Sequence, residues 1–360
     1  MKFGLGYAPR PDMWKDAVVA EDNGFSHLLA ADSHMVYGDV YAALALAADR
    51  TKRINIGTGV SIPGGRIAPI AAHSIATINQ MAPGRTILGV GTGFSARNCM
   101  GFPPIRIADF RTYIQTCREL LTGKEVLYRE GNREHWIRFL HPDHGFINLK
   151  DPIPIHVAAN GPKALQVAGE LGDGWYSIAS TPEQFRHERK IVEEAARRAG
   201  RSLKNFPMNL LSTGCVLKPG ESATSPRVLD RVGAAATTVL HAMWEKSPFG
   251  KEEAFGGIWH RYRDEFLANL KTPEDRRYLE IHEGHMLFLR PGEEKYLSDD
   301  FIRATTLTGT SDELVARLGE YREAGVTHVT LAVLSGRSGD VHGNARAMIE
   351  EFSRDVIPKL

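Results

Sequence analysis

Polar residues that could exchange protons follow the first two apolar runs of the sequence. Tyr7 stands near the end of the run KFGLGYA, and Asp32 and His34 follow the run SHLLAA. Imidazole exchanges protons readily near neutral pH, which suits His34 to acid–base chemistry with a bound ligand. We expect Asp32 to orient His34 or to bind a substrate hydroxyl, and Tyr7 to present its hydroxyl to the same ligand. Each residue also has a plain structural role open to it, as a hydrogen-bonded histidine, a loop cap or a packed aromatic ring.

Glycine and other small residues end three later apolar runs, at 57–63 (GTGVSIP), 89–93 (GVGTG) and 158–162 (AANGP). A dinucleotide-binding fingerprint requires G-x-G-x-x-G directly before a helix. Residues 89–93 instead space their glycines as G-x-G-x-G, and the next helical pattern starts only near Arg106. Small residues at strand ends leave room for a flat ligand close to the backbone. The three runs together predict a slot for a planar ligand, although ordinary turn geometry explains any one of them alone.

The segment 160–163 (NGPK) has the composition of a helix start that can bind an anion. Pro162 suits the first position of a helix, Gly161 allows close approach, and Lys163 adds positive charge. We therefore expect a phosphate group to bind here, with a simple helix cap as the alternative.

The elements that position these residues alternate between short apolar runs and longer helical stretches, which is typical of βαβ units. We predict strands at 2–8, 26–31, 53–60, 85–91, 153–159, 174–179, 206–217 and 327–333. We predict helices at 11–23, 39–50, 69–82, 106–122, 162–171, 181–199 and 311–325. This count favours a (β/α)8 TIM barrel, whose strands share one catalytic face at their carboxyl ends. An open, doubly wound sheet is the alternative.

Two stretches do not fit the barrel repeat. Residues 124–150 are charged and aromatic with β character, and residues 219–305 are long, polar and mostly helical in pattern. We interpret both as insertions in a single domain spanning residues 1–360, because neither shows the apolar content of a core of its own. Residues 339–358 are expected to form a closing helix.

The charges of the chain nearly balance, with 44 Lys and Arg against 43 Asp and Glu. No global field therefore favours nucleic acid or an anionic membrane, and a small molecule is the expected partner. The N-terminal segment lacks the apolar core of a signal peptide, and no apolar run reaches the ~20 residues that cross a bilayer. We expect a cytoplasmic protein.

The cysteines and paired histidines do not predict a metal site. Cys99, Cys117 and Cys215 are widely spaced without a CxxC pair, and we expect packed thiols. The H-x-x-H pairs at 141–144 and 282–285 have no third ligand at a spacing typical of zinc sites. The second pair lies in the long insertion, where it could line a lid over the substrate.

Four stretches resemble the luciferase-like flavin-dependent oxidoreductases, or bacterial luciferase superfamily, which includes deazaflavin-dependent methylene-tetrahydromethanopterin reductases. They are DSH followed by DVYAALALAADRTKRINIGTGVSIP, then SIATINQMAPGRTILGVGTGFSA, AANGPKALQVAGELGDGW and TLTGTSDELVARLGEYREAGVTHVTLAV. The resemblance covers nearly the whole chain. It implies a TIM barrel with a cofactor at the carboxyl ends of the strands.

The resemblance also assigns cofactor contacts. It implies a non-proline cis peptide bond, on a bulge that supports the isoalloxazine ring, near Gly59, Val60 and Ser61. It places the ribityl chain or the ring beside Thr92 and Gly93, and the phosphate beside Ala159, Asn160 and Gly161. It places Asp32 and His34 where related enzymes have polar groups next to the reactive ring atoms. We expect Ser177, late in the sixth strand, to be a further cofactor contact.

The resemblance leaves several functions open, because the chain reads SIP and RIAP where relatives often read TNP and RHP. The favoured prediction is an FMN-dependent monooxygenase that receives reduced FMN from a separate flavin reductase and oxidises a small organic substrate. The alternative is a hydride-transfer enzyme using the deazaflavin coenzyme, whose anionic tail needs a basic groove; Arg66, Arg97 and Arg106 are candidates. A non-catalytic flavin-binding protein is a third possibility. We expect a homodimer or higher homo-oligomer, formed through the Ala-rich helices at 39–50 and 69–82.

Overall fold

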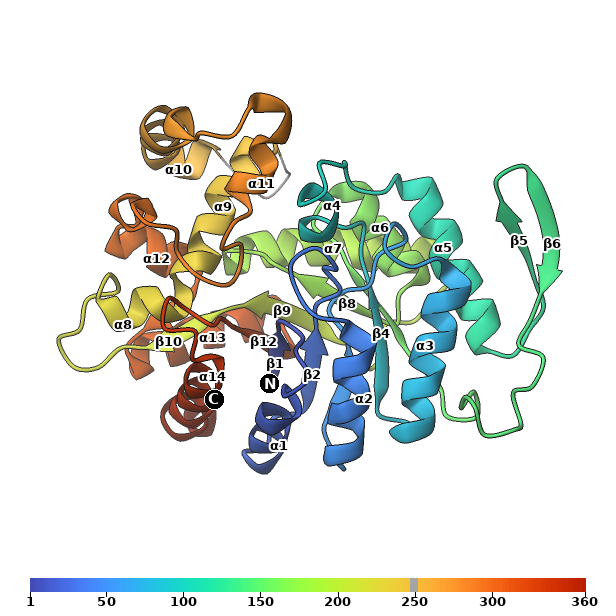
Figure 1. The fold of residues 1–360 in the computed structure, drawn as a ribbon. Helices are drawn as coiled ribbons and strands as arrows, with labels where there is room; N and C mark the ends of the chain where they lie inside the picture. Colours follow the sequence, from blue (N-terminus) through green and yellow to red (C-terminus); the bar gives the residue numbers. More distant parts are fainter. Residues whose placement is uncertain (247–251) are drawn as a thin grey trace.

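The computed structural model describes residues 1–246 and 252–360 and forms a closed barrel of parallel strands (Figure 1). Around the barrel the strands follow the order β1-β12-β9-β8-β7-β4-β3-β2. They are β1 (Lys2–Tyr7), β2 (His27–Ala30), β3 (Asn55–Thr58), β4 (Thr86–Val90), β7 (Ile155–Ala158), β8 (Gly174–Ser177), β9 (Met208–Ser212) and β12 (His328–Val333). Each predicted strand therefore contains a barrel strand. The TIM barrel is confirmed, and closure excludes the open doubly wound sheet.

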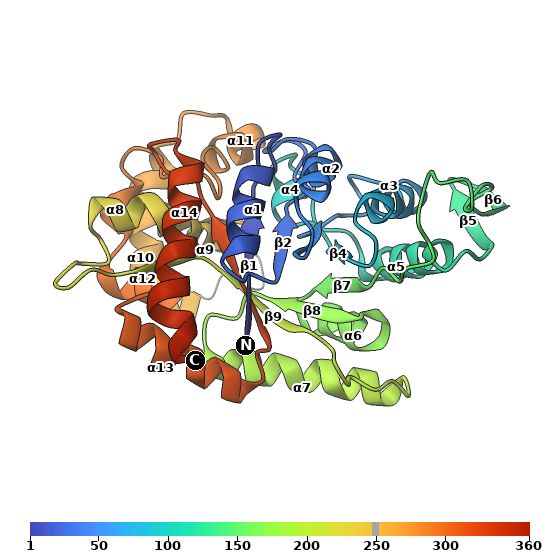
Figure 2. The ribbon, with the colours of Figure 1, turned by 90° about the horizontal axis from the view of Figure 1, so that it is seen from below.

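Helices surround the barrel on its outer side (Figure 2). They are α1 (Trp14–Asp22), α2 (Val40–Arg50), α3 (Ala68–Met81), α5 (Ile107–Leu121), α6 (Pro162–Leu171), α7 (Pro182–Arg198), α13 (Ser311–Ala324) and α14 (Val341–Glu351). The short helix α4 (Ser95–Asn98) follows β4 at the carboxyl end of the barrel (Figure 1). The predicted helices are confirmed to within a few residues at their ends. The closing helix continues from α14 as a π turn (Phe352–Val356) and a 3-10 turn (Ile357–Lys359).

The predicted strand at 206–217 is divided in the structure. β9 ends at Ser212, and β10 (Gly214–Val216) leaves the barrel to pair in parallel with β11 (Leu307–Gly309). This small sheet connects the last part of the barrel to both ends of the long insertion.

The alanines of α2 and α3 pack inside the chain. Asp39 caps α2 by accepting a hydrogen bond from the backbone N–H of Ala42 at 2.9 Å. Ala43, Ala47, Ala71 and Ala76 are buried in the main hydrophobic core. Their small side chains let both helices approach the barrel closely, so these alanines are already used within one chain.

Polar side chains fill part of the barrel interior. His27 Nε2 lies 2.7 Å from Thr330 Oγ1, which also accepts a hydrogen bond from Asn209 Nδ2 at 2.9 Å. A Cβ atom on Gly4 would lie 2.3 Å from the His27 ring, so glycine is required beside it. Burial lowers the pKa of His27 to about 3, which keeps the ring neutral. This network closes the barrel below its mouth.

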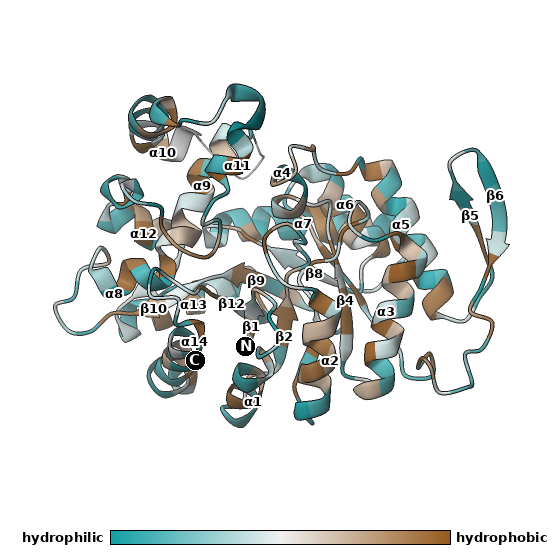
Figure 3. Cartoon of the chain, viewed as in Figure 1, coloured by the Kyte–Doolittle hydropathy of each residue, from teal (hydrophilic) through white to brown (hydrophobic). Residues whose placement is uncertain are grey.

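The first insertion forms an antiparallel hairpin of β5 (Val126–Glu130) and β6 (Arg133–Ile137), confirming its β character. The hairpin projects from the barrel and is largely hydrophilic along its outer part (Figure 3). It lies on the opposite side of the molecule from the second insertion (Figures 1 and 2). It therefore takes no part in the barrel mouth.

The second insertion contains α8 (Pro226–Val228), α9 (Ala234–Trp244), α10 (Glu252–Arg261), α11 (Arg277–Ile281) and α12 (Asp299–Thr305). The expectation that it lacks an apolar core is wrong. Val232, Leu240, Tyr262, Ile281 and Phe301 belong to a hydrophobic cluster separate from the main core. Its apolar residues are spread over short helices with polar outer faces, so the average polarity of the segment concealed them.

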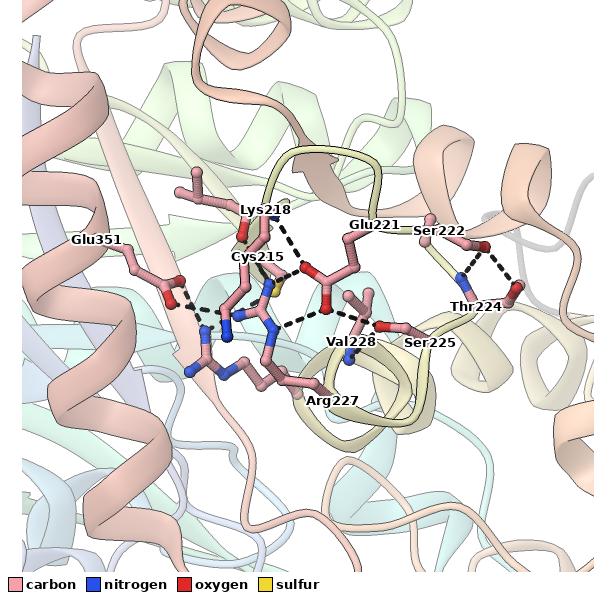
Figure 4. A network of polar contacts seen from close by, with 12 residues as sticks. Cys215, Lys218, Glu221, Ser222, Thr224, Ser225, Arg227, Val228 and Glu351 are labelled. Atoms are coloured by element: carbon pink, nitrogen blue, oxygen red, sulfur yellow. Dashed lines mark hydrogen bonds and ion pairs between the residues drawn. The ribbon is translucent and has the colours of Figure 1, made fainter.

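A network of ion pairs fixes the start of this insertion to the C-terminal helix (Figure 4). Arg227 donates to Glu221 through Nε at 2.9 Å and through Nη2, and its Nη1 lies 3.2 Å from Glu351 of α14. Arg231 donates to the other oxygen of Glu351 at 2.6 Å. Because Glu351 is bound by two guanidinium groups, the insertion is held against the barrel by charge as well as by apolar packing.

The three cysteines are buried and free, as predicted. Among the described residues, no helix combines the length and apolar character that crossing a membrane requires.

Candidate active site

A cavity of about 830 Å³ lies at the carboxyl ends of the barrel strands. Its floor and walls come from the ends of β1, β3, β4, β7, β9 and β12, and residues of α9 together with Met286 of the second insertion contribute a further wall. Its size and mostly apolar lining suit a ligand with a large planar ring. The structure therefore has a cavity where the sequence predicts a slot for a planar ligand.

The segment after β3 forms a bulge on one wall of the cavity. The peptide bond between Gly59 and Val60 is cis, which confirms the expectation for this segment. Both residues line the cavity. The N–H of Ser61 donates to the carbonyl of Gly89 at 2.8 Å, and the N–H of Gly91 donates to the carbonyl of Ser61 at 3.0 Å. The bulge is thus fixed to the neighbouring strand β4.

The glycines after β4 serve different purposes. A Cβ atom on Gly91 would lie 2.7 Å from Cγ2 of Val60, so glycine leaves room for the bulge. Gly93 has a φ of +89°, a conformation that favours glycine, and it lines the cavity beside Thr92. Gly89 lies deeper, where a Cβ atom would be 2.0 Å from the carbonyl oxygen of Thr58. The structure therefore assigns Gly89 to packing between strands and the later glycines to the wall of the cavity.

The N-terminus of α6 opens onto the same cavity. Gly161 is its N-cap residue and Pro162 its first residue. Ala159, Asn160, Gly161 and Lys163 all line the cavity. The amide oxygen of Asn160 accepts a hydrogen bond from the N–H of Ile178 at 3.1 Å, which holds the loop in place. The free N–H groups of the first turn and the lysine make this end of the helix suitable for an anion.

The hydroxyl of Tyr7 is not directed at the cavity. Its ring contributes to the wall, but the hydroxyl donates to the buried carboxylate of Asp16 on α1. Burial, and then the Asp16 charge, raise the pKa of the Tyr7 phenol far above its ordinary value. Asp16 also binds His342 of α14 at 2.7 Å. The hydroxyl therefore connects the barrel to its outer helices, and we do not carry Tyr7 forward as a catalytic residue.

Asp32 and His34 do not form the pair that the sequence suggested. Asp32 is 4% exposed and accepts hydrogen bonds from Ser61 Oγ at 2.8 Å and from Arg66 Nε at 3.0 Å. His34 is exposed, and its Nε2 lies 3.0 Å from the sulfur of Met100. None of Asp32, His34 and Ser61 is among the residues that line the cavity. The hydrogen bond between Ser61 and Asp32 therefore holds the bulge without either side chain lining the cavity.

Ser177 also points away from the cavity. It is fully buried, and its hydroxyl donates to Glu188 of α7 at 2.9 Å. Trp175, two residues earlier and so on the same face of β8, packs its ring on Phe185 of α7 at 4.8 Å. The expectation of a cofactor contact at Ser177 is therefore not met by this geometry, because its face of the strand is turned toward the helix layer.

The arginines suggested for a basic groove have partners within the chain. Arg66 pairs with Asp32 and, through Nη2 at 2.6 Å, with Asp39. Arg97 donates to the carbonyl of Pro103 at 2.6 Å, and Arg106 pairs with Asp109 at 2.8 Å. Among the residues that line the cavity, the basic side chains are those of Lys163 and Arg317.

Several wall residues were not predicted from the sequence. Tyr37 comes from the loop after β2, Ser95 from the start of α4, Val239 from α9, Met286 from the second insertion and Arg317 from α13. Each lies in a loop, a helix or an insertion, where no local pattern indicates a ligand contact. Only the path of the chain brings them to the barrel mouth.

Comparisons with known proteins agree with this architecture. Residues 9–328 match the model of a family described as luciferase-like monooxygenase. The 5,10-methylenetetrahydromethanopterin reductase of Archaeoglobus fulgidus is 28% identical over 100% of both chains. The F420-dependent glucose-6-phosphate dehydrogenase of Beutenbergia cavernae is 26% identical over 98% of this chain and 94% of its own. Among solved structures, the coenzyme F420 dependent tetrahydromethanopterin reductase from Methanopyrus kandleri gives a TM-score of 0.72 at 23% identity, covering 99% of this chain and 98% of its own.

Proposed function

Since the chain belongs to the family of luciferase-like oxidoreductases, we propose that it uses the deazaflavin coenzyme F420 for hydride transfer to or from a small organic substrate. The observation that carries the proposal is the full-length similarity to reductases and dehydrogenases, one of them named for its dependence on F420. The proposal takes the deazaflavin alternative in place of the FMN-dependent monooxygenase that the sequence alone favoured. The substrate is not identified, because residues from loops and insertions line much of the cavity and such residues set specificity.

The residues present fit a flat, anionic coenzyme. Val60 presents a hydrophobic surface on the bulge, against which a ring can lie. A Cβ atom on Gly161 would meet nothing within 4 Å, so open space exists where the backbone of the α6 N-terminus faces the cavity. We propose that this helix end and Lys163 hold the phosphate of the coenzyme. F420, when bound, supplies the hydride acceptor or donor.

The chain's own residues bind and orient the reactants. Val60 would support one face of the coenzyme ring, and Asp32 would act as a positioning residue because it holds the bulge through Ser61. Val239 and Met286 of the second insertion supply apolar surface to one wall of the cavity, which would limit the water around a bound substrate. Ser95 is a wall hydroxyl whose Oγ lies 2.8 Å from the buried Nε2 of His285. We propose that Ser95 binds the substrate oxygen where the proton is gained or lost.

An anaerobic turnover assay tests the proposal. The purified protein is mixed with oxidised or reduced F420 and a panel of alcohols, aldehydes, sugar phosphates and reduced or oxidised pterins, and the absorbance of the coenzyme is followed. We expect a substrate-dependent change in the absence of oxygen, retained in Tyr7→Phe because that hydroxyl lies outside the cavity. Turnover that requires reduced FMN and oxygen, with none from F420, would overturn the proposal in favour of the monooxygenase.

A further inference from the structure

Three buried histidines gather in the second insertion, beside the cavity. His241 lies on α9, and His282 and His285 follow α11. Their side chains are 2%, 6% and 1% exposed. One ring nitrogen of each lies within 4.8 Å of the corresponding nitrogens of the other two. Isolated buried histidines are common. Here three of them bring one ring nitrogen each to the same small volume.

The Nε2 atom of each histidine is turned toward a partner outside the group. Nε2 of His282 lies 2.6 Å from Glu245, and Nε2 of His241 lies 3.4 Å from Glu293. Nε2 of His285 lies 2.8 Å from the hydroxyl of Ser95. The Nδ1 atoms are therefore the ones left for the shared volume.

The Nδ1 atoms lack adequate hydrogen bonds. Nδ1 of His282 and Nδ1 of His285 face each other at 3.3 Å, and Nδ1 of His241 is buried with no hydrogen-bond partner. A buried polar atom without a partner destabilises the folded state. A relay of hydrogen bonds through His282 and His285 would explain two of the rings but would leave His241 unsatisfied.

A metal ion bound between the three rings would give each of them a partner. Two nitrogens bound to tetrahedral zinc at about 2.0–2.1 Å are about 3.3–3.4 Å apart, which agrees with the 3.3 Å between His282 and His285. Histidines that bind metals through one nitrogen commonly donate from the other to a carboxylate. Glu245 and Glu293 stand in that relation to His282 and His241.

We propose that His241, His282 and His285 bind one divalent transition metal ion, such as Zn²⁺, through their Nδ1 atoms. Imidazole ligands suit zinc, copper, nickel and iron, and three protein ligands leave a fourth position for water. The ion would connect α9 to the turn after α11. Met286 and Val239 line the cavity within two residues of these ligands, so the ion would fix that wall. The sequence alone does not indicate this site, because the third ligand comes from a separate helix far from the H-x-x-H pair.

Metal titration of the full chain tests the proposal. The protein is treated with a chelator, and Zn²⁺ is added in competition with a chromophoric chelator; Co²⁺ is then used for its visible absorption. We expect one ion per chain, a Co²⁺ spectrum of a low-coordinate nitrogen site, and a higher thermal midpoint with metal. His241→Gln and His282→Gln should each weaken Zn²⁺ binding at least 100-fold. His144→Gln, in the exposed H-x-x-H pair of the first insertion, is the matched control and should leave the affinity within twofold.

Variants of the supporting carboxylates separate metal binding from folding. Glu245→Gln keeps the size of the side chain and removes the charge that orients His282, so a folded variant should bind Zn²⁺ about 10–100-fold more weakly. Absence of stoichiometric binding to the wild-type protein would overturn the proposal, whichever variants fold. Binding that persists in folded His241→Gln and His282→Gln proteins would also overturn it, because the ion would then lie elsewhere. None of these readouts depends on F420, so they stand apart from the proposed function.

Discussion

Alanine should have very different effects on stability at Gly89, inside strand β4, and at Gly161, at the mouth of the barrel. A Cβ atom on Gly89 would lie 2.0 Å from the carbonyl oxygen of Thr58 and 2.9 Å from Cε2 of Tyr176, and the first of these is backbone that cannot rotate away. Adding a carbon to a packed core usually costs about 1–3 kcal/mol when side chains give way. Because the backbone of the barrel would have to shift here, we expect Gly89→Ala to lose at least about 3 kcal/mol of unfolding free energy.

The same substitution at Gly161 meets no such obstacle. The Cβ atom would have nothing within 4 Å, and the φ of −89° at this position suits any residue. We expect Gly161→Ala to change the unfolding free energy by less than about 1 kcal/mol. Alanine reduces the freedom of the unfolded chain, but it is a poorer N-cap residue than glycine, so the two effects oppose each other. Gly161 lines the cavity at the helix end that we propose for the coenzyme phosphate, so an added methyl group should lower F420 affinity at least tenfold.

Urea unfolding and an F420 titration of both variants measure these effects separately. The expected result is an unstable Gly89→Ala protein and a stable Gly161→Ala protein that binds F420 poorly. A Gly89→Ala protein as stable as the wild type would refute the packing argument. A Gly161→Ala protein with unchanged F420 affinity would remove the start of α6 from the coenzyme site.

Three further predictions follow from the contacts of charged and hydroxyl side chains. Lys163→Gln should weaken F420 binding about 5–30-fold in a fluorescence titration through loss of one charge-assisted contact, whereas Lys190→Gln, on α7, should not. Tyr7→Phe should lower the unfolding free energy by about 1–2 kcal/mol, since a buried carboxylate on α1 loses its donor, and F420 affinity should stay the same. The Arg227 guanidinium, against the cost of burial, lowers the pKa of Glu221 from its ordinary 4.5 to about 2. The ion pair therefore stabilises the fold above about pH 4.5 and loses its effect as the pH falls toward 2, so Glu221→Gln should destabilise the protein in urea at pH 7 and much less at pH 3.

The barrel could be predicted from the sequence because the same strand-and-helix pattern is repeated along the chain. Each strand is a short apolar run ended by small or turn-forming residues, and each intervening helix carries apolar residues at helical spacing. Each of the runs 57–63, 89–93 and 158–162 contributes residues to the cavity at the barrel mouth, because the carboxyl ends of parallel strands meet there. The backbone features of the site could therefore be predicted: the strand ends from the sequence pattern, and the cis bond after Gly59 from the family resemblance.

The directions in which side chains point were harder to predict from the sequence. Tyr7 and Ser177 stand at strand ends as predicted, but a strand turns alternate residues to opposite faces, and both hydroxyls point to outer helices. Asp32 follows its strand as expected, yet its partner Arg66 comes from a later loop. Such pairings depend on the fold and leave no mark on local spacing.

Contacts within the second insertion were the least predictable. Its apolar cluster is assembled from short helices, each too small to show a strong pattern, so the segment appeared to lack a core. His241 joins His282 and His285 only because α9 packs against the turn after α11. Contacts between distant segments of an insertion depend on its three-dimensional packing and leave no local pattern in the sequence.

Parallel titrations of the purified protein with F420 and with FMN, each oxidised and reduced, test the central claim most directly. The account predicts that F420 binds one molecule per chain and at least tenfold more tightly than FMN in the same oxidation state. Tighter binding of FMN, with no saturable binding of F420, would contradict the assignment of this cavity to a deazaflavin coenzyme.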